Sequence, residues 1–349
     1  MTWLLYGANG YTGKLIARLA KSQGLKPILA GRNSVQLEQL GKELDMPWRS
    51  FSLYSHEEIV ANLQDVKVVL HCAGPFSQTF RPMFNACLSA KVNYLDVTGE
   101  IGVFEELFAR DSDCKDAGIT AISGVGFDVV PTDCLAARIK EHLPEATHLR
   151  LGIAGIGAGI SRGTAKTMFE GTAHGGCIRQ DGKLVTVPLA YKTTKFTFNH
   201  ASTIAVTMPW GDLATAYRST GIPNIEVYFA TSTNAVMFMR LAELFRPLLA
   251  SAPVQIIGKE MISKYITGPS EDGRSSAKCI IVAEGKQLDK HCTLRMHCPE
   301  GYTLTSHSAL ASVQKILQNN ISKGSLTPSL AFGSDFVQQL PDIEIETLS

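Results

Sequence analysis

The 349-residue sequence has no excess of charge of either sign, since 33 lysines and arginines stand against 32 aspartates and glutamates. Nucleic acid is therefore not an expected partner, because its phosphate backbone is bound through a surplus of basic residues. The eight cysteines include no Cys-x-x-Cys pair, so neither a zinc knuckle nor a disulfide framework is indicated. We predict no metal site.

The sequence also lacks a long uninterrupted apolar run. Its most apolar stretch, residues 235–250, is interrupted by Arg240, Glu243 and Arg246, which a bilayer span does not tolerate cheaply. This pattern favours an amphipathic helix that is buried or faces a dimer partner, with contact to a membrane surface or a lipid-like substrate as the alternative. The first strand pattern begins at residue 3, so we expect no leader peptide, no transmembrane segment and a cytoplasmic protein, with peripheral membrane contact as an alternative.

What the sequence does have is a glycine-rich turn near its start. The turn lies between a short apolar run, residues 2–6, and an amphipathic helical pattern, residues 14–21. Strand, glycine turn and helix form the phosphate-binding start of a dinucleotide-binding domain, in which the helix N-terminus attracts the pyrophosphate. Gly7 permits the tight turn, Gly10 the approach of the pyrophosphate, and Gly13 close helix–strand packing. The cofactor residues predicted here are Gly7, Asn9, Gly10, Tyr11, Thr12 and Gly13; a purely structural turn is the alternative.

The second strand pattern, residues 26–31, ends without the acidic residue that an NAD-binding domain places there. Arg32 stands in its place. A guanidinium binds the 2′-phosphate of NADP bidentately, whereas a carboxylate would repel it. NADP(H) is therefore the predicted cofactor, although a solvated arginine is the alternative for this position. The remaining predicted cofactor residues are Asn33 and, in the turn after a buried strand pattern, Ala73, Gly74 and Pro75.

Strand and helix patterns alternate through the first 130 residues, with helices expected at 34–44 (Ser34 as N-cap), near 56–63, at 81–90 and at 104–118. Six strands alternating with helices predict an α/β fold with a doubly wound parallel sheet. Period-two patterns beyond residue 142 predict a second, α+β domain with a mixed sheet, whose helices begin at Thr164, Asp212 and Ser308. We divide the chain into an NADP-binding Rossmann domain at 1–132, a substrate and dimerisation domain at 133–305, and a C-terminal helix and tail at 306–349 that packs on the first domain.

A set of motifs in this order resembles the saccharopine dehydrogenase-like oxidoreductases: "GANGYTG", "AGRN", "CAGPF" and "GVGFDVVPTD". The later "GTAKT", "GPSEDGR" and "GYTLTSHSAL" are similar to the branch that includes trans-acting enoyl reductases. The resemblance covers roughly residues 3–340. It implies an NADP-binding Rossmann domain, a second domain that shapes a substrate pocket, and dimers. Substrates in this family range over amino-acid imines, polyamine precursors and lipid-like enoyl thioesters.

Four polar residues in predicted turns or at helix starts are the candidate catalytic groups. Asp128 follows the last strand of the first domain, beside the expected nicotinamide site, and a turn carboxylate is its alternative role. Asp212 precedes a helical pattern and suits an ordinary N-cap, while Tyr217 follows five residues later and suits a packed tyrosine. Arg162 suits either a ligand for a substrate anion or a solvated arginine.

Two further patterns imitate catalytic or metal-binding motifs, and we reject both. Tyr191 and Lys195 have the Tyr-x-x-x-Lys spacing of short-chain dehydrogenases, but that pair requires a helix, and the flanking sequence favours strand. His291, Cys292, His297 and Cys298 look like metal ligands. On a strand, six residues span about 20 Å, so the two histidines cannot reach one ion.

The predicted function is that of an NADP(H)-dependent oxidoreductase that transfers hydride to a C=N or activated C=C bond of a small-molecule or acyl substrate. A non-catalytic NADP(H) sensor is the alternative. The apolar residues 235–250 and the strand-rich region 180–230 add a predicted homodimer that forms through the second domain.

Overall fold

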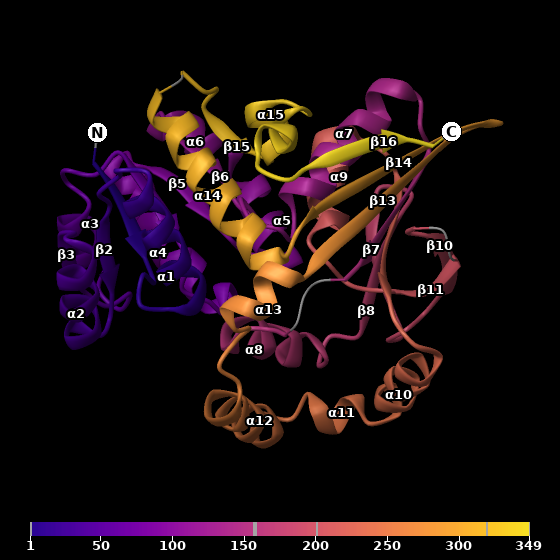
Figure 1. Cartoon of the computed structure of the whole chain (residues 1–349), viewed down its shortest axis with the longest axis horizontal. Coiled ribbons are helices and arrows are strands. Elements are labelled where there is room, and N and C mark those ends of the chain that lie inside the picture. Colours follow the sequence, from indigo (N-terminus) through magenta and orange to yellow (C-terminus); the bar gives the residue numbers. More distant parts are fainter. Residues whose placement is uncertain (1, 156–158, 200–201, 319, 349) are drawn as a thin grey trace. The chain divides into compact units, whose positions relative to one another are not determined.

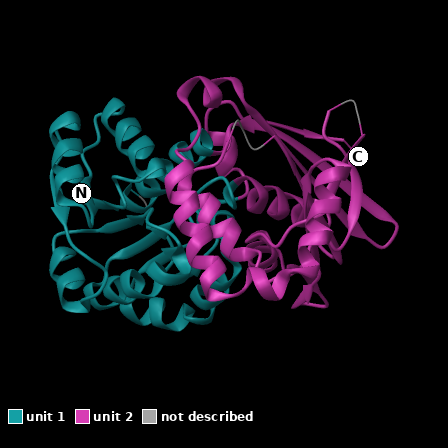
Figure 2. Cartoon of the chain, turned by 90° about the horizontal axis from the view of Figure 1, so that it is seen from below, with its two compact units in different colours: residues 1–130, 302–333 teal, residues 131–301, 334–349 magenta. Residues whose placement is uncertain are grey.

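A computed structural model describes residues 2–155, 159–199, 202–318 and 320–348. The chain forms two compact units, residues 1–130 with 302–333 and residues 131–301 with 334–349 (Figure 2). No helix of the described ranges is both long enough and apolar enough to cross a membrane.

The first unit is built on a parallel sheet of seven strands in its described part, in the order β15-β6-β5-β4-β1-β2-β3 (Figure 1). Strands β1, β2 and β4 are buried along their whole length, as expected for strands with helices on both faces. The strands are β1 (Trp3–Tyr6), β2 (Ile28–Gly31), β3 (Trp48–Ser50), β4 (Val68–His71), β5 (Asn93–Asp96), β6 (Thr120–Ile122) and β15 (Gly324–Leu326).

Helices cover both faces of this sheet and enclose two cores. On one face Ile59, Phe80 and Leu107 pack from α3, α4 and α5, and on the other Ile16 and Leu310 pack from α1 and α14. The predicted doubly wound parallel sheet is therefore confirmed. The helices of this unit are α1 (Tyr11–Ser22), α2 (Ser34–Leu44), α3 (His56–Asn62), α4 (Phe76–Ala90), α5 (Ile101–Ala109), α6 (Asp111–Ala117), α14 (Gly301–Gln318) and α15 (Pro328–Phe332).

The second unit contains a mixed sheet of nine strands in the part described, in which only β7 and β12 pair in parallel. Its strands are β7 (His148–Ala154), β8 (Gly176–Gln180), β9 (Lys183–Val187), β10 (Thr193–Thr197), β11 (Ser202–Thr207), β12 (Asn224–Ala230), β13 (Lys278–Gln287), β14 (Lys290–Pro299) and β16 (Glu344–Thr347). Its helices are α7 (Val130–His142), α8 (Arg162–Gly171), α9 (Asp212–Thr220), α10 (Thr233–Leu244), α11 (Arg246–Leu249), α12 (Ala252–Tyr265), α13 (Glu271–Ser276) and a 3-10 helix (Phe336–Gln339). The predicted mixed sheet is confirmed.

The C-terminal segment is divided between the units, which differs from the expected single tail at 306–349. Residues 302–333 lie in the first unit, where β15 pairs in parallel with β6. Residues 334–349 lie in the second unit, where β16 pairs with β14. Both strands are too short to show a periodic pattern, so the sequence did not reveal them.

Several local predictions are wrong in detail. Asn33, not Ser34, caps α2, because its side chain accepts a hydrogen bond from the Gln36 N–H at 3.0 Å. The predicted helix at 104–118 is two helices that meet at Arg110. Helix α8 begins at Arg162 rather than Thr164, and α14 at Gly301 rather than Ser308.

Candidate functional site

The glycine turn between β1 and α1 is tight and closely packed. Gly7 has φ +85°, and a Cβ atom there would lie 2.8 Å from the Ala73 backbone nitrogen in the loop after β4. A Cβ atom on Gly13 would lie 2.3 Å from the Gly7 carbonyl oxygen. The tight turn at Gly7 and the close packing at Gly13 thus agree with the sequence interpretation. Gly10 donates to the Gly7 carbonyl at 2.9 Å, which closes the turn.

The N-terminus of α1 has the properties of an anion site. Gly10 is its N-cap, no described side chain caps it, and no acidic residue lies in its first turn. By contrast, the N-termini of α2 and α4 are occupied by protein groups. Asn33 caps α2, and the Glu100 carboxylate accepts hydrogen bonds from the Phe76 and Ser77 N–H groups of α4 at 2.8 and 2.7 Å. The first turn of α1 can therefore accept a phosphate without displacing a side chain.

Arg32 lies immediately after β2, at the same edge of the sheet. Its side chain is exposed, and within the described ranges no carboxylate pairs with it. Burial raises the pKa of the nearby Tyr6 hydroxyl to about 12, and the positive charge of Arg32 opposes this rise. Asn9 spans from the glycine turn to α2, where its amide donates to Gln36 at 2.8 Å. An unpaired cation beside an open helix N-terminus suits a dinucleotide that carries a 2′-phosphate on its adenosine ribose.

The loop after β4 contains the predicted cofactor residues Ala73, Gly74 and Pro75, and its Gly74–Pro75 peptide bond is cis. The Thr79 hydroxyl holds this loop by donating to the Ala73 carbonyl at 2.6 Å, and it lies 3.1 Å from Nε2 of His71. His71 is buried, and desolvation lowers its pKa to about 3, so its imidazole is neutral near pH 7.

The loops after β5 and β6 are tied together by Asp96, the last residue of β5. Its carboxylate accepts from the Thr98 N–H at 3.0 Å, the Gly124 N–H at 3.0 Å and the Ser123 hydroxyl at 2.7 Å. Burial raises the pKa of Asp96, against the effect of these hydrogen bonds. Asp96 therefore fixes the shape of this edge of the sheet rather than facing a ligand.

Asp128 follows β6 and is the one predicted catalytic residue that lies in the first unit. Its side chain reaches solvent, yet enough protein surrounds the carboxylate to raise its pKa to about 6 by desolvation. Gly99 permits this approach, because a Cβ atom there would lie 2.8 Å from Asp128 Oδ2. The loop itself is anchored where the Phe127 N–H donates to the Thr305 hydroxyl at 2.9 Å. A carboxyl group with this pKa can exchange a proton near neutral pH.

The other three catalytic candidates lie in the second unit. Asp212 is buried and accepts a hydrogen bond from the Thr132 hydroxyl; it is the first residue of α9, and the N-cap is Gly211, which corrects the N-cap interpretation. Tyr217, also on α9, lies under the Arg179 guanidinium, 4.2 Å from its ring centroid. Arg162 starts α8 and donates through Nε to the Ile266 carbonyl at 3.3 Å. These contacts explain each residue structurally, and their catalytic roles stay predictions.

Neither rejected motif lies on a helix. Lys195 belongs to β10 and Tyr191 to the loop before it, so they do not share a helix face. His291, Cys292, His297 and Cys298 belong to β14. Within the described residues, no group of three or more His, Cys, Asp or Glu side chains could hold a metal ion.

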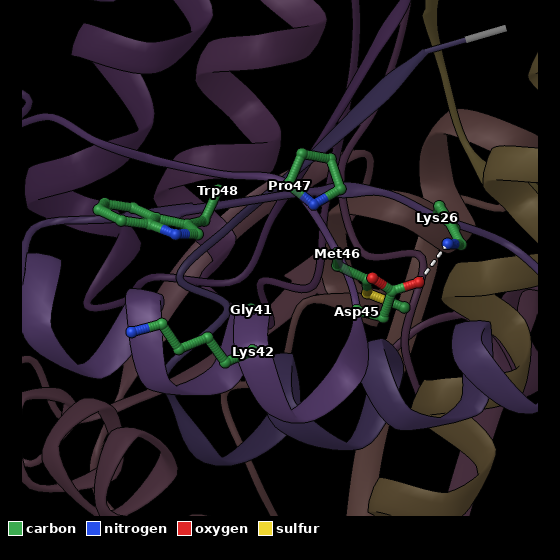
Figure 3. A pocket seen from close by; sticks show the side chains of 7 residues that line it. All are labelled: Lys26, Gly41, Lys42, Asp45, Met46, Pro47 and Trp48. Carbon is green, nitrogen blue, oxygen red and sulfur yellow. Dashed lines mark hydrogen bonds and ion pairs between the residues drawn. The ribbon is translucent and has the colours of Figure 1, made fainter.

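A hollow of about 630 Å³ lies elsewhere on the first unit and does not belong to this edge. It is lined by Lys26, Asp45 and Trp48 among others, and Lys26 pairs with Asp45 at 2.5 Å (Figure 3). Lys26 precedes β2 and Trp48 begins β3, so the hollow lies at the amino ends of the strands. Parallel sheets bind nucleotides at the opposite, carboxyl ends.

The sequence analysis did not identify five residues that shape the carboxyl-end edge of the first unit's sheet: His71, Thr79, Asp96, Gly99 and Glu100. His71 and Asp96 each end a buried strand, and a polar residue in that position was the available signal. Glu100 gave no signal, because its partners at the start of α4 lie more than twenty residues earlier in the chain.

The hydrogen bonds of Glu100 lead to a stability prediction. Replacing Glu100 by Ala should lower the free energy of unfolding by about 1–3 kcal/mol, because two N–H groups of α4 lose a charged acceptor. Urea denaturation followed by circular dichroism measures this change. Glu57→Ala, at an exposed position in the first turn of α3, is the control and should change it by less than about 0.5 kcal/mol. Equal effects of the two substitutions would contradict the structural role of Glu100.

Known proteins resemble this chain most specifically over its first unit. Residues 3–122 match the family described as the saccharopine dehydrogenase NADP binding domain. A trans-acting enoyl reductase of Mycobacterium tuberculosis is 34% identical over 143 residues, which cover 37% of this chain and 33% of that protein. A saccharopine dehydrogenase-like oxidoreductase of Arabidopsis thaliana is 31% identical over 147 residues, covering 37% of this chain and 32% of that protein. The chain thus spans about a third of the length of these relatives.

The solved structure of the saccharopine dehydrogenase (L-Glu forming) of Saccharomyces cerevisiae aligns with 100% of both chains, at a TM-score of 0.68 and 12% identity. At this identity the match shows a shared fold. The predicted resemblance to saccharopine dehydrogenase-like oxidoreductases is confirmed, and residues 3–122 of the first unit are similar to the nicotinamide dinucleotide-binding domain of that family.

Proposed function

We propose that the protein is an NADP(H)-dependent oxidoreductase that reduces a C=N or activated C=C bond of a small-molecule or acyl substrate. The observation that carries this proposal is the arrangement of one sheet edge. Arg32 follows β2, the open glycine turn follows β1, and Asp128 follows β6. In the order β6-β5-β4-β1-β2, strands β6 and β2 are four strand spacings apart. At about 4.8 Å per spacing, their carboxyl ends are about 19 Å apart. This span suits an extended dinucleotide.

The residues present fit this cofactor. The uncapped first turn of α1 and the glycine cradle, which a Cβ atom on Gly13 would fill, would hold the pyrophosphate. Arg32 would hold the 2′-phosphate, with Asn9 and Asn33 beside it. The loops at Ala73–Pro75 and around Gly99 lie toward the β6 end, where the nicotinamide would lie. The bound cofactor supplies hydride, and the protein positions it and excludes water.

The chain itself supplies the proton. Asp128 is proposed to donate it to the substrate atom that does not receive hydride, because its raised pKa of about 6 leaves a protonated fraction near neutral pH. The substrate class is proposed from the relatives named as enoyl reductase and saccharopine dehydrogenase-like oxidoreductase. Asp212, Tyr217 and Arg162 are proposed as substrate-side residues of the second unit.

The test is a turnover measurement with purified protein. We expect steady oxidation of NADPH in the presence of either an α,β-unsaturated acyl thioester or an α-imino acid generated from an amine and a keto acid. NADPH binding is measured in parallel by calorimetry. Tight binding without turnover on both substrate classes would favour the sensor alternative, and absence of NADPH binding would refute both functions.

A further inference from the structure

A second hollow, of about 750 Å³, lies on the mixed sheet of the second unit, and we call it the sheet hollow. Strands β12, β7, β13 and β14, which are neighbours in the sheet, contribute most of its lining. Residues that pair in register on neighbouring strands point to the same face. The paired residues that line the sheet hollow therefore form rows of adjacent side chains. Its volume falls within the range of about 300–1,000 Å³ that is typical of small-molecule sites.

The first row contains two carboxylates, and both are paired with cations. Glu226, Arg150 and Glu284 are in-register partners on β12, β7 and β13. Arg150 forms an ion pair with Glu284, and Lys192 forms one with Glu226 at 2.5 Å. The Tyr228 hydroxyl also donates a hydrogen bond to Glu226 at 2.6 Å. No other acidic residue of the described ranges lines the sheet hollow, so its negative charge is matched by these partners.

The second row places three basic side chains on three neighbouring strands. His148, Lys286 and His291 are in-register partners on β7, β13 and β14, and all three are exposed. Among the residues that the structure describes, no carboxylate pairs with them. Nδ1 of His148 lies 3.0 Å from the Thr147 hydroxyl, which leaves Nε2 for a ligand. A protonated imidazole opposite a lysine destabilises a sheet, and a bound anion would remove this repulsion.

The polar lining distinguishes the sheet hollow from the apolar surface of the same unit. Large apolar side chains of α10 and α12 are exposed, with Leu244 at 74% and Ile257 at 57%. Residues 235–250 are therefore not buried within the chain, which was one of the two placements expected for them. No described residue of α10, α11 or α12 lines the sheet hollow.

We propose that the sheet hollow binds a small phosphate monoester, with His148, Lys286 and His291 as its phosphate site. An ammonium group binds phosphate as a point charge, and protonated imidazoles add N–H donors. A carboxylate ligand is matched better by the planar fork of a guanidinium, but the Arg150 guanidinium is already paired with Glu284. The free cationic groups therefore favour phosphate over carboxylate. This proposal does not depend on the proposed function, because it uses none of the residues assigned to cofactor or catalysis.

The rest of the sheet hollow suits the organic part of such a molecule. The Tyr191 ring is 43% exposed and lines the hollow, with Nζ of Lys192 5.4 Å from the ring centroid. Gln180 and Thr293 add an amide and a hydroxyl group to the lining. An aromatic ring beside neutral hydrogen-bonding groups fits a hydroxylated body, as in a sugar phosphate.

Calorimetric titration of the full chain with glucose 6-phosphate, inorganic phosphate, glucose and citrate tests the proposal. We expect saturable binding of both phosphates, tighter for glucose 6-phosphate, and no binding of glucose. Citrate should bind at least about 10-fold more weakly than glucose 6-phosphate, although it carries more charge, because no guanidinium is free for its carboxylates. If neither phosphate binds at up to about 10 mM, or if citrate binds as tightly as glucose 6-phosphate, the proposal is wrong.

Substitutions at exposed positions locate the site without disturbing the core. Lys286→Gln should weaken glucose 6-phosphate about 10-fold or more, because a charge-assisted contact is lost, whereas Lys286→Arg should keep most of the affinity. Lys195→Gln is the matched control, since Lys195 is an exposed lysine of β10 in the same sheet that does not line the hollow. Tyr191→Ala should weaken glucose 6-phosphate but leave inorganic phosphate unchanged. Equal losses in Lys286→Gln and Lys195→Gln would show a diffuse effect of charge and overturn the assignment.

Discussion

Replacing Asp128 by Asn should lower the rate of NADPH-dependent reduction by about 100- to 10,000-fold, the usual contribution of a positioned general acid. The amide keeps the shape of the side chain but carries no transferable proton. NADPH affinity should change little, since Asp128 lies at the β6 end of the sheet edge, away from the phosphate-binding turn. Single-turnover kinetics at saturating NADPH measures the rate, and calorimetry measures the affinity.

The pH dependence of the reduction rate tests whether Asp128 is the proton donor. A proton donor must be protonated before the step, and desolvation by the surrounding protein raises the pKa of Asp128 to about 6. The wild-type rate should therefore be maximal below pH 6 and fall about tenfold per pH unit well above it, whereas Asp128→Asn should lose this dependence. Asp116→Asn, the same change at an exposed position on α6, is the control and should match the wild type. If Asp128→Asn keeps the wild-type pH profile, another group supplies the proton.

NADPH should bind about 10- to 150-fold more tightly than NADH, and Arg32 should account for the difference. A charge-assisted bond to the 2′-phosphate is worth about 1.5–3 kcal/mol, which corresponds to this ratio. The glycine turn would meet the pyrophosphate of either cofactor, so it cannot discriminate between them. Arg32→Ala should bring the two affinities close together, and Arg32→Asp should weaken NADPH strongly while sparing NADH.

Calorimetric titration of both cofactors against the wild type and the two variants decides this point. Arg18→Ala is the matched control, because Arg18 is an exposed arginine of the same unit whose guanidinium pairs with Glu43 at 3.0 Å on α2. It should leave the preference for NADPH unchanged. Equal binding of the two cofactors by the wild type, or a preference that survives Arg32→Ala, would show that another group recognises the phosphate.

The prediction of the first unit succeeded because its signals are local. The apolar run of β1, the glycines at positions 7, 10 and 13, and the amphipathic pattern of α1 are adjacent in the chain, and each restricts the backbone by itself. The same holds for Arg32, whose place at the end of β2 needs only the strand boundary. Prediction failed for β15 and β16, which contain three and four residues and exist only because they pair with β6 and β14.

The sequence by itself determined the fold class of the first unit, its glycine turn and the cation at the end of β2, because these depend on neighbouring residues. Only the tertiary structure decided the raised pKa of Asp128, the occupation of the α4 N-terminus by Glu100 and the exposure of the large apolar residues on α10 and α12. A pKa depends on how much protein surrounds a group, and the exposed face of a helix depends on what packs against its other side. Residues distant in the chain set both.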